Sequence, residues 1–492
     1  MMQRFFANKY SVFPAILISA VLYFFSTGLQ VNYWFLLWFA PVPVLLYSFF
    51  NSNKAAFWAS FAAFTLSKAN ILLYFMRLLP PALAVMIIII TGLLFACAIV
   101  LNKIMITRLK APVAVFVFPV LMTVFGLILN LFDGTFGDMA SLGYTQVNNV
   151  YLLQIVSITG MYGITFILAL FASLVTFLLL ITDQKIGFKT FILPFLIFIA
   201  VFGFGILRLN HSGNFALIKS SQNQPRFRAV CLDVEHLSLG LNVNNPDNKD
   251  LLLQKYIELI EKYCTQPTDL VLFPEKITKL QPAEKSKYYN MFATLAYHEK
   301  CVIIVGWTLQ GRFDKNMATV FFPDGKSTLE YQKKHLVKGW ERTFSQGKHA
   351  LTFDYKHCKL GVAICKDLDF PEWIRKYSSA AVLLVPAWDF QTDHWLHSRI
   401  AFLRGVENGF TLVRSAKEGD LTINDPYGRV VKEVVYTKNS SEQVLIAEFE
   451  PVKLDTFYSK YGDWFTWLNL IALFIMLLYL PWRFARTGSW KA

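Results

Sequence analysis

The stretch Leu360–Trp373, LGVAICKDLDFPEW, decides how the polar part of this chain folds. Its first five residues, Leu360–Ile364, form a short apolar run that indicates a buried strand. Cys365 follows directly, and Pro371 is placed to begin a helix, because proline suits a first helical turn. Amide N–H groups at such a strand-to-helix turn can stabilise a thiolate and an oxyanion. Cys365 is therefore a candidate nucleophile, although most lone cysteines are buried structural residues.

Two other predicted strands also end in ionisable groups. The run DLVLFPEK at 269–276 ends in a carboxylate, Glu275, and the run LEYQKKHLV at 329–337 contains Lys333 where its strand ends. Because ligands collect beyond the carboxyl ends of strands in α/β sheets, we expect Glu275, Lys333 and Cys365 to converge. Together they supply a general base, a cation for developing negative charge and a nucleophile.

This ordered Glu–Lys–Cys set resembles the nitrilase, or carbon–nitrogen hydrolase, superfamily. The resemblance covers roughly residues 226–450 and implies an α-β-β-α sandwich with Glu275, Lys333 and Cys365 as its catalytic triad. A weaker similarity places Asn316 before a hairpin. The alternation of predicted strands and helices in this region independently favours an α/β layered fold.

The rest of the chain is too apolar for a soluble enzyme. Of its 492 residues, 55% are hydrophobic, and 46 are phenylalanine. Segments long and apolar enough to span a bilayer lie at 10–29, 33–50, 55–76, 79–101, 112–132, 161–182, 190–207 and 464–482. The sequence therefore predicts a multi-span α-helical membrane domain with seven transmembrane helices (1–211), a nitrilase-like domain (225–452), and an eighth transmembrane helix with a tail (463–492).

The positive charges predict the orientation. Lys and Arg concentrate in the connections that would lie on the same side of the membrane as the N-terminus, whereas residues 133–160, on the other side, contain no Lys or Arg. Basic residues mark the cytoplasmic side, so both termini are expected there and the nitrilase-like domain outside the cytoplasm. The net charge of +14 is then mainly a topology signal, and no nucleic-acid partner is expected. No Cys or His spacing indicates zinc, and neither metal nor cofactor is expected.

A second resemblance narrows the function. The segments Gly143–Gln146, Leu153–Gln154 and Met161–Gly163 are similar to sequences of the bacterial apolipoprotein N-acyltransferases, whose architecture is seven spans, a periplasmic nitrilase domain and a terminal span. The resemblance implies a bacterial inner-membrane enzyme. It would move a fatty acyl chain from a phospholipid, through a thioester on Cys365, to the N-terminal amine of a diacylglyceryl-cysteine lipoprotein.

Several further residues are expected to support this chemistry. The resemblance places a second essential glutamate at Glu341, inside the non-periodic run 337–350, which is a candidate lid. Trp340 and Trp388 are candidates to line a hydrophobic crevice for acyl chains. Aromatic residues near a membrane are, however, at least as often interface anchors.

The chain departs from the acyltransferase pattern beside the nucleophile. The family usually has Tyr-Glu after its cysteine, and this chain has Lys366-Asp367. Lys366 would add a second cation next to Cys365, and its backbone N–H would join Lys333 in binding the oxyanion. The departure leaves a membrane-tethered nitrilase-type amidase, acting on a different amide, as the alternative function.

A non-catalytic or transport role is the third possibility. Lys68 lies within a predicted span, and an intramembrane charge is a functional hypothesis by default. A lysine near a span end usually extends to the interface instead. The absence of a proton-relay pattern or inverted repeat weighs against transport. Five cysteines fall in the polar domain, so at least one is free or shared between chains.

Overall fold

The computed structural model describes residues 5–6, 8–29, 33–132, 137–138, 141–184, 186–218, 226–234, 246–438 and 440–487. The chain forms two compact units. The first comprises residues 1–209 and 461–492, and the second comprises residues 210–460. Residues 212–218 are helical, and residues 219–225 lie outside the described residues.

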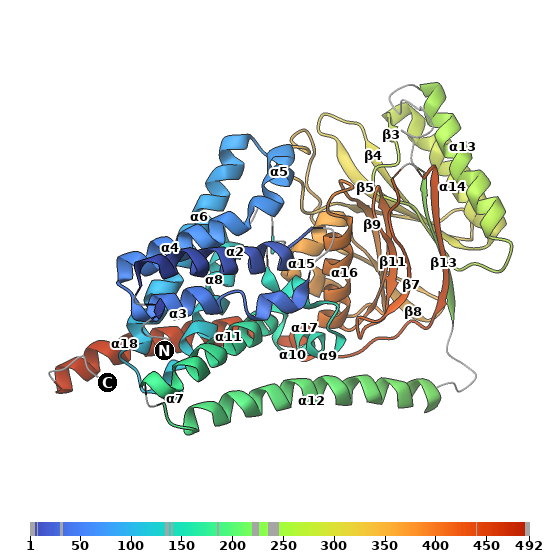
Figure 1. Cartoon of the computed structure of the whole chain (residues 1–492). Helices are drawn as coiled ribbons and strands as arrows, with labels where there is room; N and C mark the ends of the chain where they lie inside the picture. Colours follow the sequence, from blue (N-terminus) through green and yellow to red (C-terminus); the bar gives the residue numbers. More distant parts are fainter. Residues whose placement is uncertain are drawn as a thin grey trace. The chain divides into compact units, whose positions relative to one another are not determined.

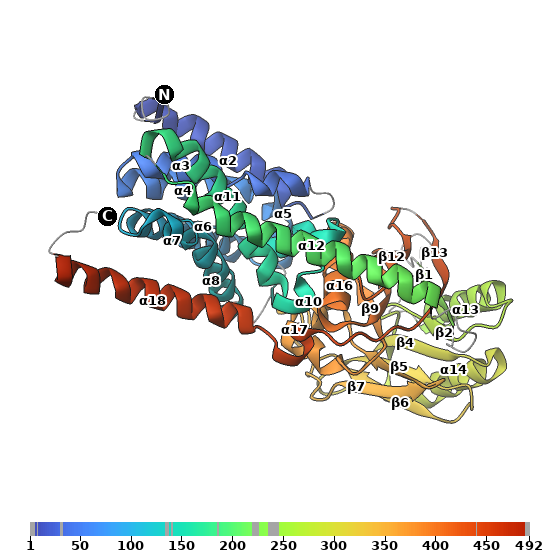
Figure 2. The ribbon, with the colours of Figure 1, turned by 90° about the horizontal axis from the view of Figure 1, so that it is seen from below.

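The first unit is a bundle of apolar helices. Its elements are α2 (Val12–Ser26), η2 (Trp34–Trp38), α3 (Val42–Phe50), α4 (Asn53–Ser67), α5 (Ala69–Leu78), α6 (Pro81–Ile106), α7 (Ala111–Ala114), α8 (Val117–Phe132), η3 (Leu142–Gln146), α9 (Val150–Leu153), α10 (Val156–Thr159), α11 (Met161–Gln184), α12 (Lys189–Ile218) and α18 (Trp464–Thr487). Helix α4 packs against α2 and α6, and α8 packs against α6, α11 and α18 (Figure 2).

The lengths of these helices fit a membrane domain. Within the described residues, four helices are long and apolar enough to cross a bilayer: Pro81–Ile106, Ala111–Asn130, Met161–Ile181 and Lys189–Asn210. Helices α4 and α5 together satisfy the same test but bend by 61° at Lys68. The remaining predicted spans coincide with shorter apolar helices. The helical membrane domain is confirmed, while the number of crossings stays a prediction.

The segment that resembles the acyltransferases is packed inside the first unit. The Gln146 amide accepts a hydrogen bond from Trp38 Nε1 at 3.0 Å and donates one to the Trp34 carbonyl at 2.9 Å. A Cβ added at Gly143 would lie 3.0 Å from the Met161 carbonyl oxygen. This part of the segment therefore fixes η3 against η2 and α11 rather than forming a plain interfacial loop. Residues 133–136 and 139–140 lie outside the described residues.

Two sheets form the centre of the second unit (Figure 1). The first has the order β13-β1-β2-β4-β5-β6, with β3 also paired to β4, and the second has the order β12-β11-β10-β9-β8-β7. The strands are β1 (Phe227–Val234), β2 (Leu270–Leu272), β3 (Lys279–Leu280), β4 (Val302–Leu309), β5 (Lys315–Phe321), β6 (Thr328–Gln332), β7 (Leu351–Tyr355), β8 (Cys358–Val362), β9 (Val382–Trp388), β10 (Thr411–Lys417), β11 (Leu421–Asn424), β12 (Val430–Val434) and β13 (Glu442–Phe449).

Helices cover the outer face of each sheet. Helices α13 (Pro246–Tyr263) and α14 (Lys285–Glu299) pack their apolar residues on the first sheet. Helix α16 (His394–Asn408) packs on the second sheet, close to the short helix α15 (Pro371–Ile374). The inner faces meet where β1 contacts β10 and where β2 and β4 contact β9. The predicted α-β-β-α sandwich is confirmed.

Candidate active site

Glu275 is held at the carboxyl end of β2 by a close approach of two backbones. A Cβ added at Gly306, on the neighbouring strand β4, would lie 2.2 Å from the Pro274 carbonyl oxygen. Only glycine leaves room for the turn to pass that strand. The Glu275 backbone N–H donates to the Ala387 carbonyl at 3.1 Å, so the turn is also fixed to the second sheet. Its side chain is buried between the sheets.

Lys333 follows β6 and is fixed by its backbone on both sides. Its N–H donates to the Asn316 carbonyl at 2.9 Å, and its carbonyl accepts from the Gly347 N–H at 2.8 Å. A Cβ at Gly347 would lie 1.9 Å from the Gln332 carbonyl oxygen, so the run 337–350 returns to Lys333 only because residue 347 is glycine. The ammonium therefore projects into the same buried space as Glu275.

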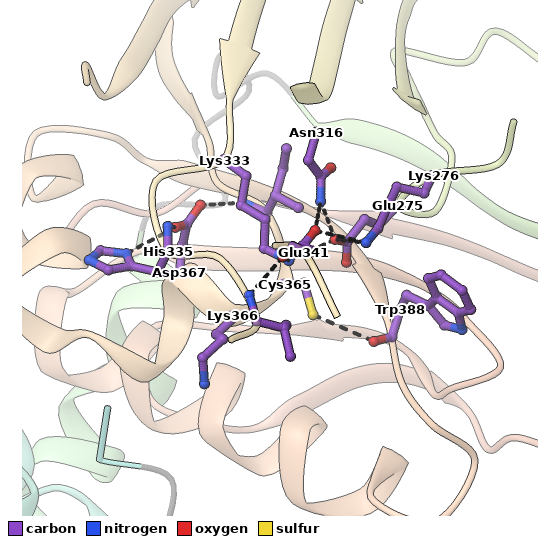
Figure 3. A network of polar contacts seen from close by, with 12 residues as sticks. Glu275, Lys276, Asn316, Lys333, His335, Glu341, Cys365, Lys366, Asp367 and Trp388 are labelled. Carbon is purple, nitrogen blue, oxygen red and sulfur yellow. Dashed lines mark hydrogen bonds and ion pairs between the residues drawn. The ribbon is translucent and has the colours of Figure 1, made fainter. Parts of the chain in front are cut away.

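Cys365 lies on a strained turn after β8. Its φ of +44° is in the left-handed region, which a residue with a side chain adopts at a cost of about 1–3 kcal/mol. The turn begins the 3-10 helix η5 (Cys365–Asp369). The thiol is buried and donates toward the Trp388 carbonyl oxygen at 3.5 Å. The predicted strand-to-helix junction is present, and Figure 3 shows the sulfur contacting the Trp388 carbonyl oxygen with the buried charges beside it.

Four charged side chains form one network beside the sulfur (Figure 3). Lys333 Nζ lies 2.8 Å from Glu275 Oε1 and 3.2 Å from Glu341 Oε2. Lys276 Nζ lies 2.7 Å from Glu341 Oε1. The Asn316 amide donates to Glu275 at 2.6 Å and to Glu341 at 2.7 Å. Two carboxylates and two ammonium groups thus balance each other, which is how buried charges are tolerated.

The network changes the pKa values of its members. Burial opposes the charged form of Lys333, but Glu275, Glu341 and Cys365 outweigh it and raise the pKa of this ammonium well above its usual value. Burial also opposes ionisation of Glu341, yet Lys333 and Lys276 lower the pKa of its carboxyl to about 2. Lys333 and Glu341 are therefore charged at neutral pH.

The candidate nucleophile, Cys365, is uncharged at rest, unlike Lys333 and Glu341. Burial first, and then the charge of Glu275, raise the pKa of the Cys365 thiol well above its usual value, and Lys333 only partly offsets them. At rest the group is a thiol, so a base must remove its proton during attack. The three predicted residues lie together, since Lys333 contacts Glu275 and Figure 3 shows Cys365 beside them.

Lys276 is the member of the network that the sequence did not single out. It adjoins Glu275 in the run 269–276, and nothing in that run indicated that it would pair with Glu341. Asn316 was noted only as a weak similarity. Its position in β5, directly opposite Thr308 of β4, brings its amide to both carboxylates.

Asp367 and Lys366 both point away from the sulfur. Asp367 is buried and accepts hydrogen bonds from Tyr331 Oη at 2.6 Å, from the Ile364 N–H at 3.1 Å and from the His335 N–H at 2.8 Å. It therefore connects the Cys365 turn to the Lys333 segment. The Lys366 ammonium pairs with Asp369 Oδ2 at 3.3 Å. The expected second cation beside the nucleophile is thus turned elsewhere.

Aromatic rings line one side of the site. Trp388 lies 6.0 Å from Phe390, and Phe390 lies 5.0 Å from Trp340, measured between ring centroids. Trp340 is 51% exposed, whereas Glu341 next to it is 3% exposed. The candidate lid is therefore anchored through Glu341, with Trp340 at its exposed tip.

A second polar cluster is buried nearby. Asp389, Asp393 and His397 offer ligand atoms that lie within 4.8 Å of one another. Asp389 pairs with Arg414, and Asp393 Oδ2 lies 3.0 Å from His397 Nε2. Burial opposes the charge on His397, but Asp393 outweighs it and raises its pKa to about 9. The two carboxylates are thus already matched by two cations. All six cysteines are unpaired.

Two sequence profiles cover most of the chain. The carbon–nitrogen hydrolase profile matches residues 239–457, and the profile of the apolipoprotein N-acyltransferase N-terminal domain matches residues 19–174. The Geobacter metallireducens apolipoprotein N-acyltransferase is 26% identical over 67% of this chain and 67% of its own length. Together these matches support the assignment of the chain as a divergent apolipoprotein N-acyltransferase of the nitrilase superfamily.

The chain is also similar to several other proteins. The Rickettsia bellii apolipoprotein N-acyltransferase is 27% identical over 68% of this chain and 70% of its own. Omega-amidase NIT3 of Saccharomyces cerevisiae is 27% identical over 44% of this chain and 87% of its own. The solved structure of Saccharomyces cerevisiae Nit3, a nitrilase superfamily member, has 24% sequence identity and a TM-score of 0.39, covering 46% of this chain and 91% of that chain.

Proposed function

We propose that this protein N-acylates lipoproteins by moving a fatty acyl chain from a phospholipid to the N-terminal amine of a diacylglyceryl-cysteine. Its similarity to the apolipoprotein N-acyltransferases supports the reaction class. The roles of base, cation and nucleophile rest on one observation, the contact of Lys333 Nζ with Glu275 Oε1 at 2.8 Å. The charges of both residues also act on the pKa of the adjacent Cys365 thiol.

In the first half-reaction, Glu275 takes the proton of the Cys365 thiol as the sulfur attacks the ester carbonyl carbon of the phospholipid. Lys333 has bonds to two carboxylates and retains a third N–H, which is available for the oxyanion together with the backbone N–H of Lys366. The C–O bond then breaks, Glu275 returns its proton to the leaving alkoxide, and a lysophospholipid departs.

In the second half-reaction, the lipoprotein amine attacks the thioester carbonyl. Glu275 removes a proton from the amine, the C–S bond breaks, and the thiolate regains that proton. The raised pKa of Cys365 makes the sulfur unstable as a free thiolate in this site. The fold therefore keeps the nucleophile protonated between turnovers, and every proton passes through one carboxyl group.

A two-part measurement tests this proposal. Purified protein is incubated with phospholipid and digested, and the mass of the peptide containing Cys365 is measured by mass spectrometry. We expect a mass increase equal to one acyl chain, present with Cys358→Ser and absent with Cys365→Ser. Cys358 is a matched control because it is also an unpaired thiol of the second sheet. Lipoprotein N-termini from cells with and without the protein should then differ by one fatty amide.

The outcomes separate the candidate functions. A thioester without any change in lipoprotein termini would support an amidase or another acyl transfer instead. Omega-amidases among the relatives of the catalytic unit give that alternative a specific basis. Full lipoprotein acylation by the Cys365→Ser variant would refute the covalent mechanism.

The topology is also a proposal. The first unit crosses the bacterial inner membrane eight times, with both termini in the cytoplasm and the second unit on the periplasmic side. The distribution of Lys and Arg supports this arrangement. Alkaline phosphatase fused after Lys110 should be inactive, and the same enzyme fused after Glu450 should be active. The reverse pattern would refute the orientation.

A further inference from the structure

Lys417 is a buried cation that the proposed mechanism does not use. It ends strand β10 and is paired in register with Trp388 of β9. Its side chain is largely enclosed, since the residue is 5% exposed. Among the described residues its ammonium has no hydrogen bond and no ion pair. The ammonium makes a cation–π contact with Trp388, in which Lys417 Nζ lies 4.4 Å from the ring centroid.

The acids around Lys417 are engaged elsewhere. The Glu418 carboxylate accepts a hydrogen bond from Gln391 Nε2 at 3.2 Å. Asp233 Oδ2 accepts one from the Glu418 backbone N–H at 3.2 Å. Glu275, which also acts on Lys417 through its charge, is bound by Lys333. None of these carboxylates lies within ion-pair distance of the Lys417 ammonium.

Such a cation is costly to keep in a folded protein. Burial of a polar group without a hydrogen bond is unfavourable, and burial of a charge is more so. A cation–π contact offsets only part of this cost. Burial accordingly lowers the pKa of Lys417, with Asp233 and Glu418 opposing that effect. An apolar residue would fill the position better if its role were packing alone.

Trp388 supplies a second donor at the same place. Its indole Nε1–H is buried and has no acceptor among the described residues. The same ring is faced by Lys276, whose ammonium lies 5.3 Å from its centroid. The backbone carbonyl oxygen of Trp388 accepts a hydrogen bond from the Cys365 thiol. Among the described residues, two hydrogen-bond donors without acceptors therefore belong to side chains that contact each other, and the backbone of Trp388 also contacts Cys365.

We infer that Lys417 and the indole N–H of Trp388 form an anion subsite for the phosphate diester of the acyl donor. An anion with two oxygens satisfies both donors at once, and a phosphate diester offers two such oxygens. In a phospholipid, the phosphate is joined through glycerol to the ester that Cys365 attacks. The subsite therefore binds the donor on the headgroup side of the scissile ester. This inference rests on the proposed use of a phospholipid.

The test compares a charged and an uncharged donor in the full-length protein in detergent micelles. Phosphatidylglycerol and a diacylglycerol with the same chains are offered separately, and initial rates of thioester formation on Cys365 are measured against donor concentration. We expect Lys417→Met to lower the ratio of kcat/KM for the phospholipid to that for the diacylglycerol about 10- to 100-fold, mainly through KM. This range corresponds to one charge-assisted hydrogen bond.

Two further variants and a control make the result specific. Lys417→Arg should retain most of the ratio, because it keeps the charge. Trp388→Phe should lower the ratio about 3- to 10-fold, because it keeps the ring and removes one N–H. Lys432→Met is the matched control. It removes the charge of an exposed lysine from the same sheet and should leave the ratio unchanged.

A separate arm uses inorganic phosphate as a competitor. Inhibition that is lost in Lys417→Met, together with an unchanged donor ratio, would assign the subsite to free phosphate and overturn the headgroup assignment. An unchanged ratio in folded Lys417→Met and Trp388→Phe, without phosphate inhibition, would overturn the subsite altogether. In both cases the wild type still forms the thioester. If the wild type forms no thioester from either lipid, the proposed function itself fails.

Discussion

Lys276 Nζ lies 2.7 Å from Glu341 Oε1, and this ion pair joins the residue after Glu275 to the glutamate on the loop that carries Trp340. Lys333 contacts the other oxygen of Glu341 at 3.2 Å. Glu341 is therefore enclosed by two cations, and with Glu275 the four charges sum to zero. Both the position of the loop and the charge of Lys333 depend on that balance.

Removal of one charge from this set should destabilise the second unit more than removal of two opposite charges. Glu341→Gln leaves an excess cation in a buried site, which costs about 3–5 kcal/mol. Lys276→Met leaves an excess carboxylate, and the double variant restores neutrality. The free energy of unfolding is measured by denaturant unfolding. We expect its decrease in the double variant to be at least about 1 kcal/mol smaller than the sum of the decreases in the two single variants.

Two results would contradict this account. Additive losses would mean that Lys276 and Glu341 do not interact. A Glu341→Gln variant as stable as the wild type would mean that the site does not depend on charge balance. Lys432→Met is a suitable reference, because it removes an exposed charge from a strand outside the network.

Gly306→Ala should reduce activity without removing any catalytic group. The new Cβ would lie 2.2 Å from the Pro274 carbonyl oxygen and must displace the turn that carries Glu275. Because a displacement of about 1 Å in a catalytic group can lower a rate about 100-fold, we expect a loss of that order in the rate of thioester formation. Gly203→Ala is the control, since nothing lies within 4 Å of its added Cβ. Equal rates in both variants would refute the role of Gly306.

Asp367→Asn should weaken the Cys365 turn. The buried carboxylate accepts hydrogen bonds from Tyr331, Ile364 and the His335 backbone, and an amide cannot accept from all of them. We expect a loss of about 2–4 kcal/mol in unfolding free energy, together with a lower kcat and a nearly unchanged KM. Tyr331→Phe removes one of these bonds and should produce the same pattern on a smaller scale. A large change in KM alone would instead indicate that Asp367 contacts substrate.

The stability of the second unit should fall as pH rises from 6.5 to 9. The pKa of His397 is raised from 6.5 to about 9, chiefly by Asp393 acting against burial, so the folded state holds its proton more tightly than the unfolded state. That contribution is complete below pH 6.5 and is lost as pH rises through 9. It amounts to at most about 3 kcal/mol, or roughly 6–12 °C in unfolding midpoint.

His397→Gln should flatten this pH dependence, while the exposed His298→Gln should leave it intact. Thermal unfolding of both variants at several pH values tests the assignment. A His397→Gln protein with the full wild-type pH dependence would locate the responsible group elsewhere.

Much of this protein could be predicted from local patterns. Apolar runs of spanning length indicated the membrane domain, and alternating strands and helices indicated the layered α/β domain. Strand-end positions singled out Glu275, Lys333 and Cys365, because ligands collect beyond the carboxyl ends of strands. The structure brings the three together from two sheets, since β2 and β6 belong to the first sheet and β8 to the second. The family-level similarity extended this to Glu341.

The partners of these residues could not be predicted in the same way. Lys366 was expected beside the sulfur because it adjoins Cys365 in sequence, but a turn with positive φ at Cys365 sends its side chain to Asp369. The sequence pattern also did not predict the break between α4 and α5, because the two helices form one apolar run. In the structure this run bends by 61° at Lys68. Sequence proximity does not fix direction where the backbone leaves a regular element.

The sequence by itself determined which segments are apolar, which strands end in a carboxylate, an ammonium or a thiol, and in what order they occur. Only the tertiary structure decided that Lys276 neutralises Glu341 and that Asp367 fixes the turn of Cys365. It also decided that Lys417 lies against Trp388 without an ion pair to any described residue. The physical reason is that hydrophobic patterning depends on near neighbours in the chain. Charge pairing in a buried site depends on distances between strands that are remote in sequence.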